Sequence, residues 1–127
     1  MTQEQKDLLL KDLCARLPYG VICDMWFERN ESNKITEVLK CGGLMRLMNS
    51  EFNFMVKPYL RPMESMTEEQ QKEFDQLIGL ELKAINDEIA HTQVTAFEVD
   101  FYNKNHFDYR GLIDKGLAID ATGLNIY

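Results

Sequence analysis

The sequence lacks long apolar segments, and this excludes a membrane-spanning helix. No stretch approaches the roughly 18 apolar residues that such a helix needs. The amino-terminal segment begins with acidic and amide side chains and has only a short leucine run, so it lacks the basic and apolar regions of a signal peptide. We therefore expect a cytoplasmic protein with no membrane partner.

Cysteine is scarce and unpaired. The three cysteines, Cys14, Cys23 and Cys41, are odd in number and show no paired spacing, so we expect reduced, buried thiols and no disulfide framework. The metal-binding motifs C-x-x-C, H-E-x-x-H and H-x-x-x-H are absent. We therefore expect no metal and no cofactor.

Positive charge is also sparse. The chain has 14 Lys and Arg against 21 Asp and Glu, a formal net charge of -7. Binding nucleic acid through its phosphates needs clustered cations, and the obvious candidates are scattered. They are Lys57, Arg61, Lys104 and Arg110. A nucleic-acid partner is not expected, and the acidity mainly favours solubility.

No known catalytic pattern occurs. The pair Gly42-Gly43 is not framed as a phosphate-binding loop. A Cys-His nucleophile pair has no support in the spacing. The many acidic residues between positions 68 and 88 alternate with lysines, as expected of a solvated helix face. We name no catalytic residue and favour a non-enzymatic function, while leaving an enzyme open.

The composition is that of a folded domain. The 127 residues are 45% hydrophobic and 28% charged, close to the average for globular proteins. This length supports one hydrophobic core of good size but not two. We therefore predict a single domain over residues 1–127.

The first quarter of the chain predicts a helix followed by a strand. Thr2 and Gln5 have the spacing of a capping box, and leucines then recur at helical intervals. The segment Leu17 to Gly20 contains a proline and a glycine that end the helix. Val21 to Phe27 is rich in β-branched and aromatic residues and predicts a strand.

The middle of the chain predicts further short strands. Glu28 to Lys34 is polar and predicts an exposed connection, and Ile35 to Cys41 alternates as a strand does. Gly42-Gly43 then permits a bend before two more strands, which we place at Leu44 to Met48 and Phe52 to Val56. Together they predict an antiparallel meander of three or four strands, curled or barrel-like.

The segment after this meander should leave the sheet. Lys57 to Pro62 contains two prolines, so we expect it to cross the surface in extended form and not to be a central strand. Helices follow. Thr67 and Gln70 have the spacing of a second capping box.

The next apolar residues form a helical seam: Phe74, Ile78, Leu82, Ile85 and Ile89. Gly79 is a candidate point for a bend or break. Thr95 to Asn105 fits either a strand or a short helix, and we favour the helix. The predicted fold class is therefore α+β, with an amino-terminal helix, a small antiparallel meander, and carboxy-terminal helices before a compact tail.

Reactive side chains concentrate near the carboxy-terminal end. His106, Asp108, Tyr109 and Arg110 bring an imidazole, a carboxylate, a phenol and a guanidinium within five positions, a set that could bind an anion. In the structural alternative, Asp108 caps the turn, Tyr109 packs, and Arg110 pairs with Asp108 or Asp114. We favour this alternative and keep the ligand site as a hypothesis.

Aromatic residues supply candidates for protein binding. Trp26 and Phe27 are adjacent in the predicted strand, so their side chains point to opposite faces and one is expected to be exposed. An exposed aromatic is a typical anchor for a protein partner. We add Tyr59, from the proline-flanked segment, as a third candidate.

Three segments carry a resemblance to a known family. They are Asp12 to Val21, Lys57 to Thr67, and His106 to Ala118. They resemble a family of small uncharacterised proteins encoded by gut anaerobic bacteria and by their prophages and other mobile elements. The family carries no assigned activity, so the resemblance implies a phage or mobile-element context and no residue roles.

Two functions from different classes follow. The leading hypothesis is a non-catalytic module that binds a protein partner, as an accessory of a phage or mobile element or as an inhibitor of a host-defence factor. The alternative is a domain that binds a small anionic ligand or nucleotide, with a homo-oligomer left open. A hydrolytic or metal-dependent enzyme is a third, less supported hypothesis.

Overall fold

The computed structural model describes the backbone of residues 2–49, 53–84 and 87–127, and their side chains outside 78–95. It is an α+β fold, as predicted. The described residues form four α-helices, which are α1 (Gln3–Arg16), α2 (Cys41–Asn49), α3 (Glu68–Ala84) and α4 (Asp87–Lys104). The same residues form four strands, which are β1 (Ile22–Phe27), β2 (Ile35–Val38), β3 (Phe54–Leu60) and β4 (Ile119–Asp120). Three short 3-10 helices lie between them, at Leu17–Tyr19 (η1), Glu28–Asn33 (η2) and Met63–Ser65 (η3).

The strands form one open, mixed sheet. Their order is β2-β1-β3-β4, with β1 antiparallel to both of its neighbours and β4 parallel to β3. The prediction of a barrel-like antiparallel meander is therefore wrong. The fourth strand of the observed sheet, β4, comes from the carboxy-terminal segment, far from β3 in sequence. Two parallel strands need a long crossover between them, and the segment that contains α3 and α4 provides it.

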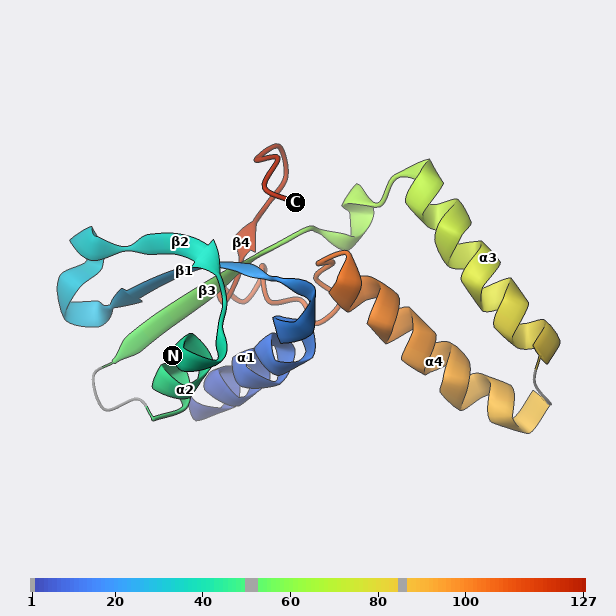
Figure 1. Cartoon of the computed structure of the whole chain (residues 1–127), viewed down its shortest axis with the longest axis horizontal. Helices are drawn as coiled ribbons and strands as arrows, with labels where there is room; N and C mark the ends of the chain where they lie inside the picture. Colours follow the sequence, from blue (N-terminus) through green and yellow to red (C-terminus); the bar gives the residue numbers. More distant parts are fainter. Residues whose placement is uncertain (1, 50–52, 85–86) are drawn as a thin grey trace.

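Helices α1 and α2 lie on one side of the sheet (Figure 1). The predicted capping box of α1 is confirmed: the Gln5 backbone N–H donates to the Thr2 hydroxyl at 3.1 Å, and the Thr2 N–H donates to the Gln5 side chain at 3.0 Å. One turn apart on the inner face, Leu9 and Leu13 are fully buried. The sheet side of this core comes from β1 and β3, whose side chains on that face are Cys23, Met25, Phe54, Val56 and Leu60.

The segment Leu44 to Met48 is part of helix α2, so the prediction of a strand there is wrong. Leu44 and Leu47 are buried while Met45 and Met48 are exposed, a three-residue repeat that fits a helix and not a strand. The two glycines, taken as a bend, instead lie in the first turn of α2. A Cβ at Gly43 would lie 3.1 Å from the Leu39 Cδ1 atom, a tight contact that requires the Leu39 side chain to shift slightly.

Strand β3 runs through Pro58, so the prediction that Lys57–Pro62 leaves the sheet is also wrong. Glu28 N–H donates to the Asn53 carbonyl at 3.0 Å. Since hydrogen-bonded and non-hydrogen-bonded residue pairs alternate along an antiparallel ladder, this bond shows which pairs of β1 and β3 are hydrogen-bonded. Cys23 and Pro58 then face each other as a non-hydrogen-bonded pair. The proline nitrogen points away from β1, and β4 pairs only with the last two residues of β3. No ladder bond is lost.

Helices α3 and α4 form a hairpin that projects away from the sheet (Figure 1). The second capping box is confirmed, because Gln70 N–H donates to the Thr67 hydroxyl at 3.2 Å. Helix α3 continues through Gly79, and the helix favoured over Thr95–Asn105 is confirmed as the end of α4. Phe74 packs against Phe101 at 5.2 Å between ring centres. Of the other predicted seam residues, Ile85 lies outside the described residues, as do the side chains of Ile78, Leu82 and Ile89.

The cysteine prediction is correct for one residue. Cys23 is buried in the sheet, and burial raises the pKa of its thiol to about 12. Cys14 and Cys41 are exposed, so the prediction that they are buried is wrong. Cys14 follows the inward-facing Leu13 and points outward, while Cys41 starts α2. In the part of the chain that the structure describes, no helix combines the length and apolar character needed to cross a bilayer.

The two glycines of α2 should respond differently to alanine. Gly42→Ala adds a Cβ in open space, so we expect it to raise the free energy of unfolding by up to about 1 kcal/mol through helix propensity. Gly43→Ala gains the same propensity but presses on Leu39 and Met25, so it should be clearly less stable than Gly42→Ala. Urea denaturation of both variants measures the difference, and equal stabilities would contradict the packing argument.

Candidate functional site

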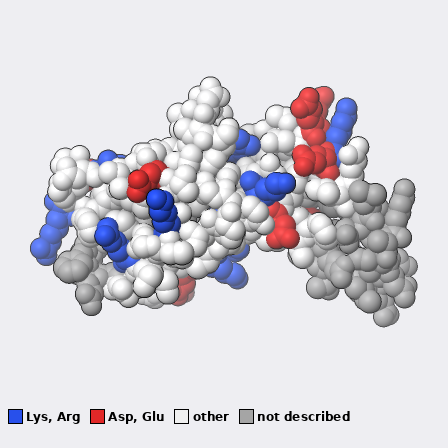
Figure 2. Space-filling model, in the orientation of Figure 1, with Lys and Arg blue, Asp and Glu red and all other residues white. Residues whose placement is uncertain are grey.

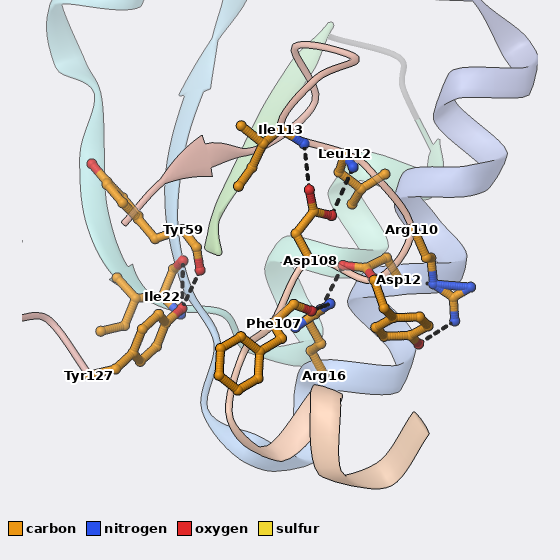
Figure 3. Close-up of polar contacts among 11 residues, drawn as sticks. Asp12, Arg16, Ile22, Tyr59, Phe107, Asp108, Arg110, Leu112, Ile113 and Tyr127 are labelled. Atoms are coloured by element: carbon orange, nitrogen blue, oxygen red, sulfur yellow. Dashed lines mark hydrogen bonds and ion pairs between the residues drawn. The ribbon is translucent and has the colours of Figure 1, made fainter. Parts of the chain in front are cut away.

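The predicted ligand residues lie in or next to a segment that pairs with Arg61, the residue that follows β3. Arg61 N–H donates to the His106 carbonyl at 2.8 Å, and Asp108 N–H donates to the Arg61 carbonyl at 2.8 Å. Residues 106–108 therefore run beside the end of β3 in a parallel bridge centred on Phe107. This backbone pairing brings the segment against the carboxy-terminal end of α1 (Figure 3).

Asp108 caps the turn that follows it. Its carboxylate accepts hydrogen bonds from the backbone N–H groups of Leu112 at 2.8 Å and Ile113 at 3.0 Å (Figure 3). The side chain is almost fully buried, and a buried carboxylate is stable only with such donors. The predicted capping role of Asp108 is confirmed.

The guanidinium of Arg110 pairs with Asp12 of α1, so the predicted pairing with Asp108 or Asp114 is wrong. Arg110 Nε lies 3.2 Å from one Asp12 oxygen, and Arg16 Nε lies 2.8 Å from the other (Figure 3). Burial raises the pKa of Asp12, while the two guanidinium groups act in the opposite direction. Both Asp12 and Arg16 are completely buried, which makes this an interior ion cluster.

Two further contacts tie this cluster to the carboxy-terminal segment. Arg16 also donates to the backbone carbonyl of Phe107. Arg110 donates to the hydroxyl of Tyr109 at 2.7 Å, and the Tyr109 ring stacks on Tyr102 at 5.6 Å. The Tyr109 packing suggested by the sequence is confirmed.

His106 is buried under an aromatic ring. Its backbone has φ +60°, and its imidazole stacks on Tyr127 with 3.9 Å between ring centres. Burial, together with the nearby positive charges of Arg16 and Arg61, lowers the pKa of His106 to about 4. At neutral pH this histidine is uncharged.

The Tyr127 hydroxyl lies between Ile22 of β1 and Tyr59 of β3 and bridges their backbone groups. Ile22 N–H donates to this oxygen at 2.8 Å, and the hydroxyl donates to the Tyr59 carbonyl at 2.7 Å (Figure 3). A side chain from the carboxy-terminal tail thus replaces the direct strand-to-strand hydrogen bond expected at this pair.

The four predicted ligand residues lie near one another in the fold, but the contacts of their side chains described above are made within the chain. Asp108 and Arg110 bind backbone and side-chain partners, and His106 and Tyr109 stack on tyrosines. The proposal that His106, Asp108, Tyr109 and Arg110 bind an anion stays a prediction.

A groove of about 440 Å³ lies at the other end of β1, between β2, η2 and α2. Its apolar lining consists of Met25, Trp26, Phe27, Ile35 and Phe54. Its polar lining includes Glu37, Lys40 and Arg46. Within this groove Phe27 is 39% exposed and Ile35 is 51% exposed, so large apolar surface remains in contact with water.

Two of the three predicted protein-binding residues line this groove. Phe27 is the exposed member of the Trp26-Phe27 pair and packs on Phe54 at 5.1 Å. Trp26 is half-buried, with the Lys34 ammonium 4.3 Å from its ring centre. The third residue, Tyr59, lies elsewhere in the sheet, where its hydroxyl donates to Asp24 at 2.8 Å.

Sequence reasoning missed Ile35, Lys40 and Arg46 as site residues. The groove exists because α2 is a helix that stands beside the sheet, and a strand at Leu44–Met48 would have left no such wall. The three-residue spacing of Leu44 and Leu47 was the available signal.

Comparison of the chain with protein-family models, with curated proteins and with solved structures finds no significant match. The resemblance drawn from the sequence segments therefore stays a prediction, and the functional argument rests on the geometry.

Asp12 should be critical for stability. Asp12→Ala leaves Arg16 buried without its partner, so we expect a loss of about 3–5 kcal/mol in the free energy of unfolding. Asp7→Ala, in the same helix but exposed, is the matched control and should change it by less than about 0.5 kcal/mol. Urea denaturation measures both, and similar losses would show that the ion cluster is not needed.

His106 should make stability depend on pH. The folded pKa is about 4, below the ordinary value of about 6.5, so neutral His106 stabilises the fold above about pH 6.5, and this contribution is lost as pH falls towards 4. The loss should be on the order of 2–3 kcal/mol relative to His106→Asn, which tolerates the positive φ. Denaturation curves at several pH values test this, and parallel profiles for the two proteins would refute it.

Proposed function

We propose that the protein is a non-catalytic binding module that engages a protein partner through the groove around Trp26 and Phe27. The observation that carries the proposal is the exposed apolar surface of the groove. Phe27 and Ile35 remain exposed beside a concave surface of about 440 Å³. Exposed apolar surface with a polar rim is typical of protein interaction sites.

The mixed lining supports a protein partner. The floor is aromatic and aliphatic, and charged groups stand at the rim on Glu37, Lys40 and Arg46. A buried apolar centre with a polar rim is the usual arrangement of binding energy in protein interfaces. Phe27, which packs on Phe54 at 5.1 Å between ring centres, offers a preorganised aromatic anchor.

The sequence resemblance adds a context to this proposal. On that basis the module is an accessory of a phage or mobile element, or an inhibitor that occupies a surface of a host-defence factor. The groove is compatible with either role, because both require only specific binding.

The test is affinity capture from source cells with matched variants. Wild type should retain a stoichiometric protein partner, and Phe27→Ala should reduce its recovery at least about tenfold, as expected for loss of an aromatic anchor. Tyr19→Ala is the control, since Tyr19 and Phe27 have the same exposed fraction of 39%. Equal recovery with all variants, or no stoichiometric protein with wild type, would refute the proposal.

A further inference from the structure

Strand β2 is an edge with free backbone groups. Leu39 N–H donates to the Val21 carbonyl at 2.9 Å, which fixes the alternation of the β1–β2 ladder. Cys23 and Glu37 are then a hydrogen-bonded pair, so the backbone groups of Thr36 and Val38 point outward. Among the described residues, none bonds to these outward groups. All four residues of β2 are exposed.

A second copy of the chain fits this edge poorly. The symmetric antiparallel register that uses all four outward groups sets Thr36 of one copy opposite Val38 of the other. Glu37 then faces Glu37, and Lys34 faces Lys40. Like charges directly opposite each other destabilise a strand pair, and a charged edge is a common protection against self-association.

A strand from another protein would fall beside the groove. Its side chains on the same face as Ile35 and Glu37 would lie next to the groove, whose apolar floor includes Phe27 and Phe54. An apolar side chain at such a position would cover Phe27 and Ile35. Strand addition gains affinity from backbone hydrogen bonds and specificity from alternate side chains in pockets.

The positive charge of the groove favours acidic residues near that apolar side chain in the bound strand. Lys40 and Arg46 line the groove and form no ion pair within the described part of the chain. They outnumber the single lining carboxylate of Glu37, although the whole chain carries a net charge of -7. Figure 2 shows Lys and Arg spread over the sheet end of the visible face, where Asp and Glu are fewer.

We infer that β2 accepts an extended acidic segment of a partner protein as an added strand, with an apolar side chain of that segment in the groove beside Ile35. This inference rests on the proposed function and specifies the kind of partner. The added strand bonds to Thr36 and Val38, its carboxylates face Lys40 and Arg46, and the sheet grows to five strands.

The test uses random linear peptides displayed on phage, selected on wild-type protein and then synthesised. Selected peptides should carry acidic residues two positions from an apolar residue, because such residues share one face of an extended strand. Val38→Pro removes one outward N–H and no β1–β2 bond, so it should weaken their binding at least about tenfold, the equivalent of one hydrogen bond. Val38→Ala, which keeps the N–H, should weaken binding less than about threefold.

Charge is tested in the same peptides. Arg46→Glu should weaken binding at least about tenfold, while Lys11→Glu, an equal charge change on the exposed side of α1, should weaken it less than about threefold. Hydrogen exchange on wild type gives a readout that needs no variant to fold. Peptide binding should slow exchange at the Thr36 and Val38 amides.

Several results would overturn the inference. They are selected peptides that bind Val38→Pro as tightly as wild type, basic selected peptides, no selected peptide at all, or unchanged exchange at Thr36 and Val38. A concentration-dependent dimer abolished by Val38→Pro would assign the edge to a second copy. If the captured partner binds Val38→Pro normally but not Phe27→Ala, the proposed function stands and strand addition fails.

Discussion

The carboxylate of Asp12, held between two guanidinium groups, connects the two ends of the chain. It lies on α1, while Arg110 belongs to a segment almost a hundred residues later, at a sequence separation of 98. Arg16 reaches the same segment through the Phe107 carbonyl. Buried charges of this kind gain little net stability because their desolvation is costly, but the geometry that satisfies them is restrictive. That geometry holds residues 106–108 beside Arg61, and so prepares the chain to return to the sheet as β4.

The two ends of β1 have opposite characters. Near Ile22 the tail and the turn around Asp108 supply hydrogen-bond partners from within the chain. Near Phe27 apolar side chains face water and the outer edge of β2 has free backbone groups. The contacts near Ile22 are made within the chain and stabilise the fold. The surface near Phe27 is exposed, so another molecule can cover it. This contrast is the reason that we propose binding at the groove.

Local signals in the sequence predicted the elements that depend on local physics. Both capping boxes, the first strand and the α+β class are confirmed, because each depends on residues a few positions apart. The errors arose where tertiary packing decides. Pro58 fits a central strand because its nitrogen points away from β1 and β4 does not reach it, and Gly43 lies in a helix where Leu39 and Met25 leave little space for a side chain.

The candidate site was predicted in part for the same reason. Trp26 and Phe27 were recognised from their type and alternation, which the strand confirms. Lys40 and Arg46 were not recognised, since their position in the lining of the groove depends on the orientation of α2 against the sheet. The pairing of Arg110 with Asp12 likewise required knowledge of a contact between distant segments.

The position of Tyr127 in the sheet determines when the sheet can be completed during synthesis of the chain. Its hydroxyl supplies the bridge between β1 and β3, and β4 pairs with β3 from the same late part of the chain. A nascent chain that has exposed only β1, β2 and β3 therefore cannot complete its sheet, and the Ile22 N–H and the Tyr59 carbonyl stay without the partner they have in the fold. Final closure must wait until residue 127 has left the ribosome, so the last stage of folding follows translation of this residue and does not accompany the synthesis of the sheet strands.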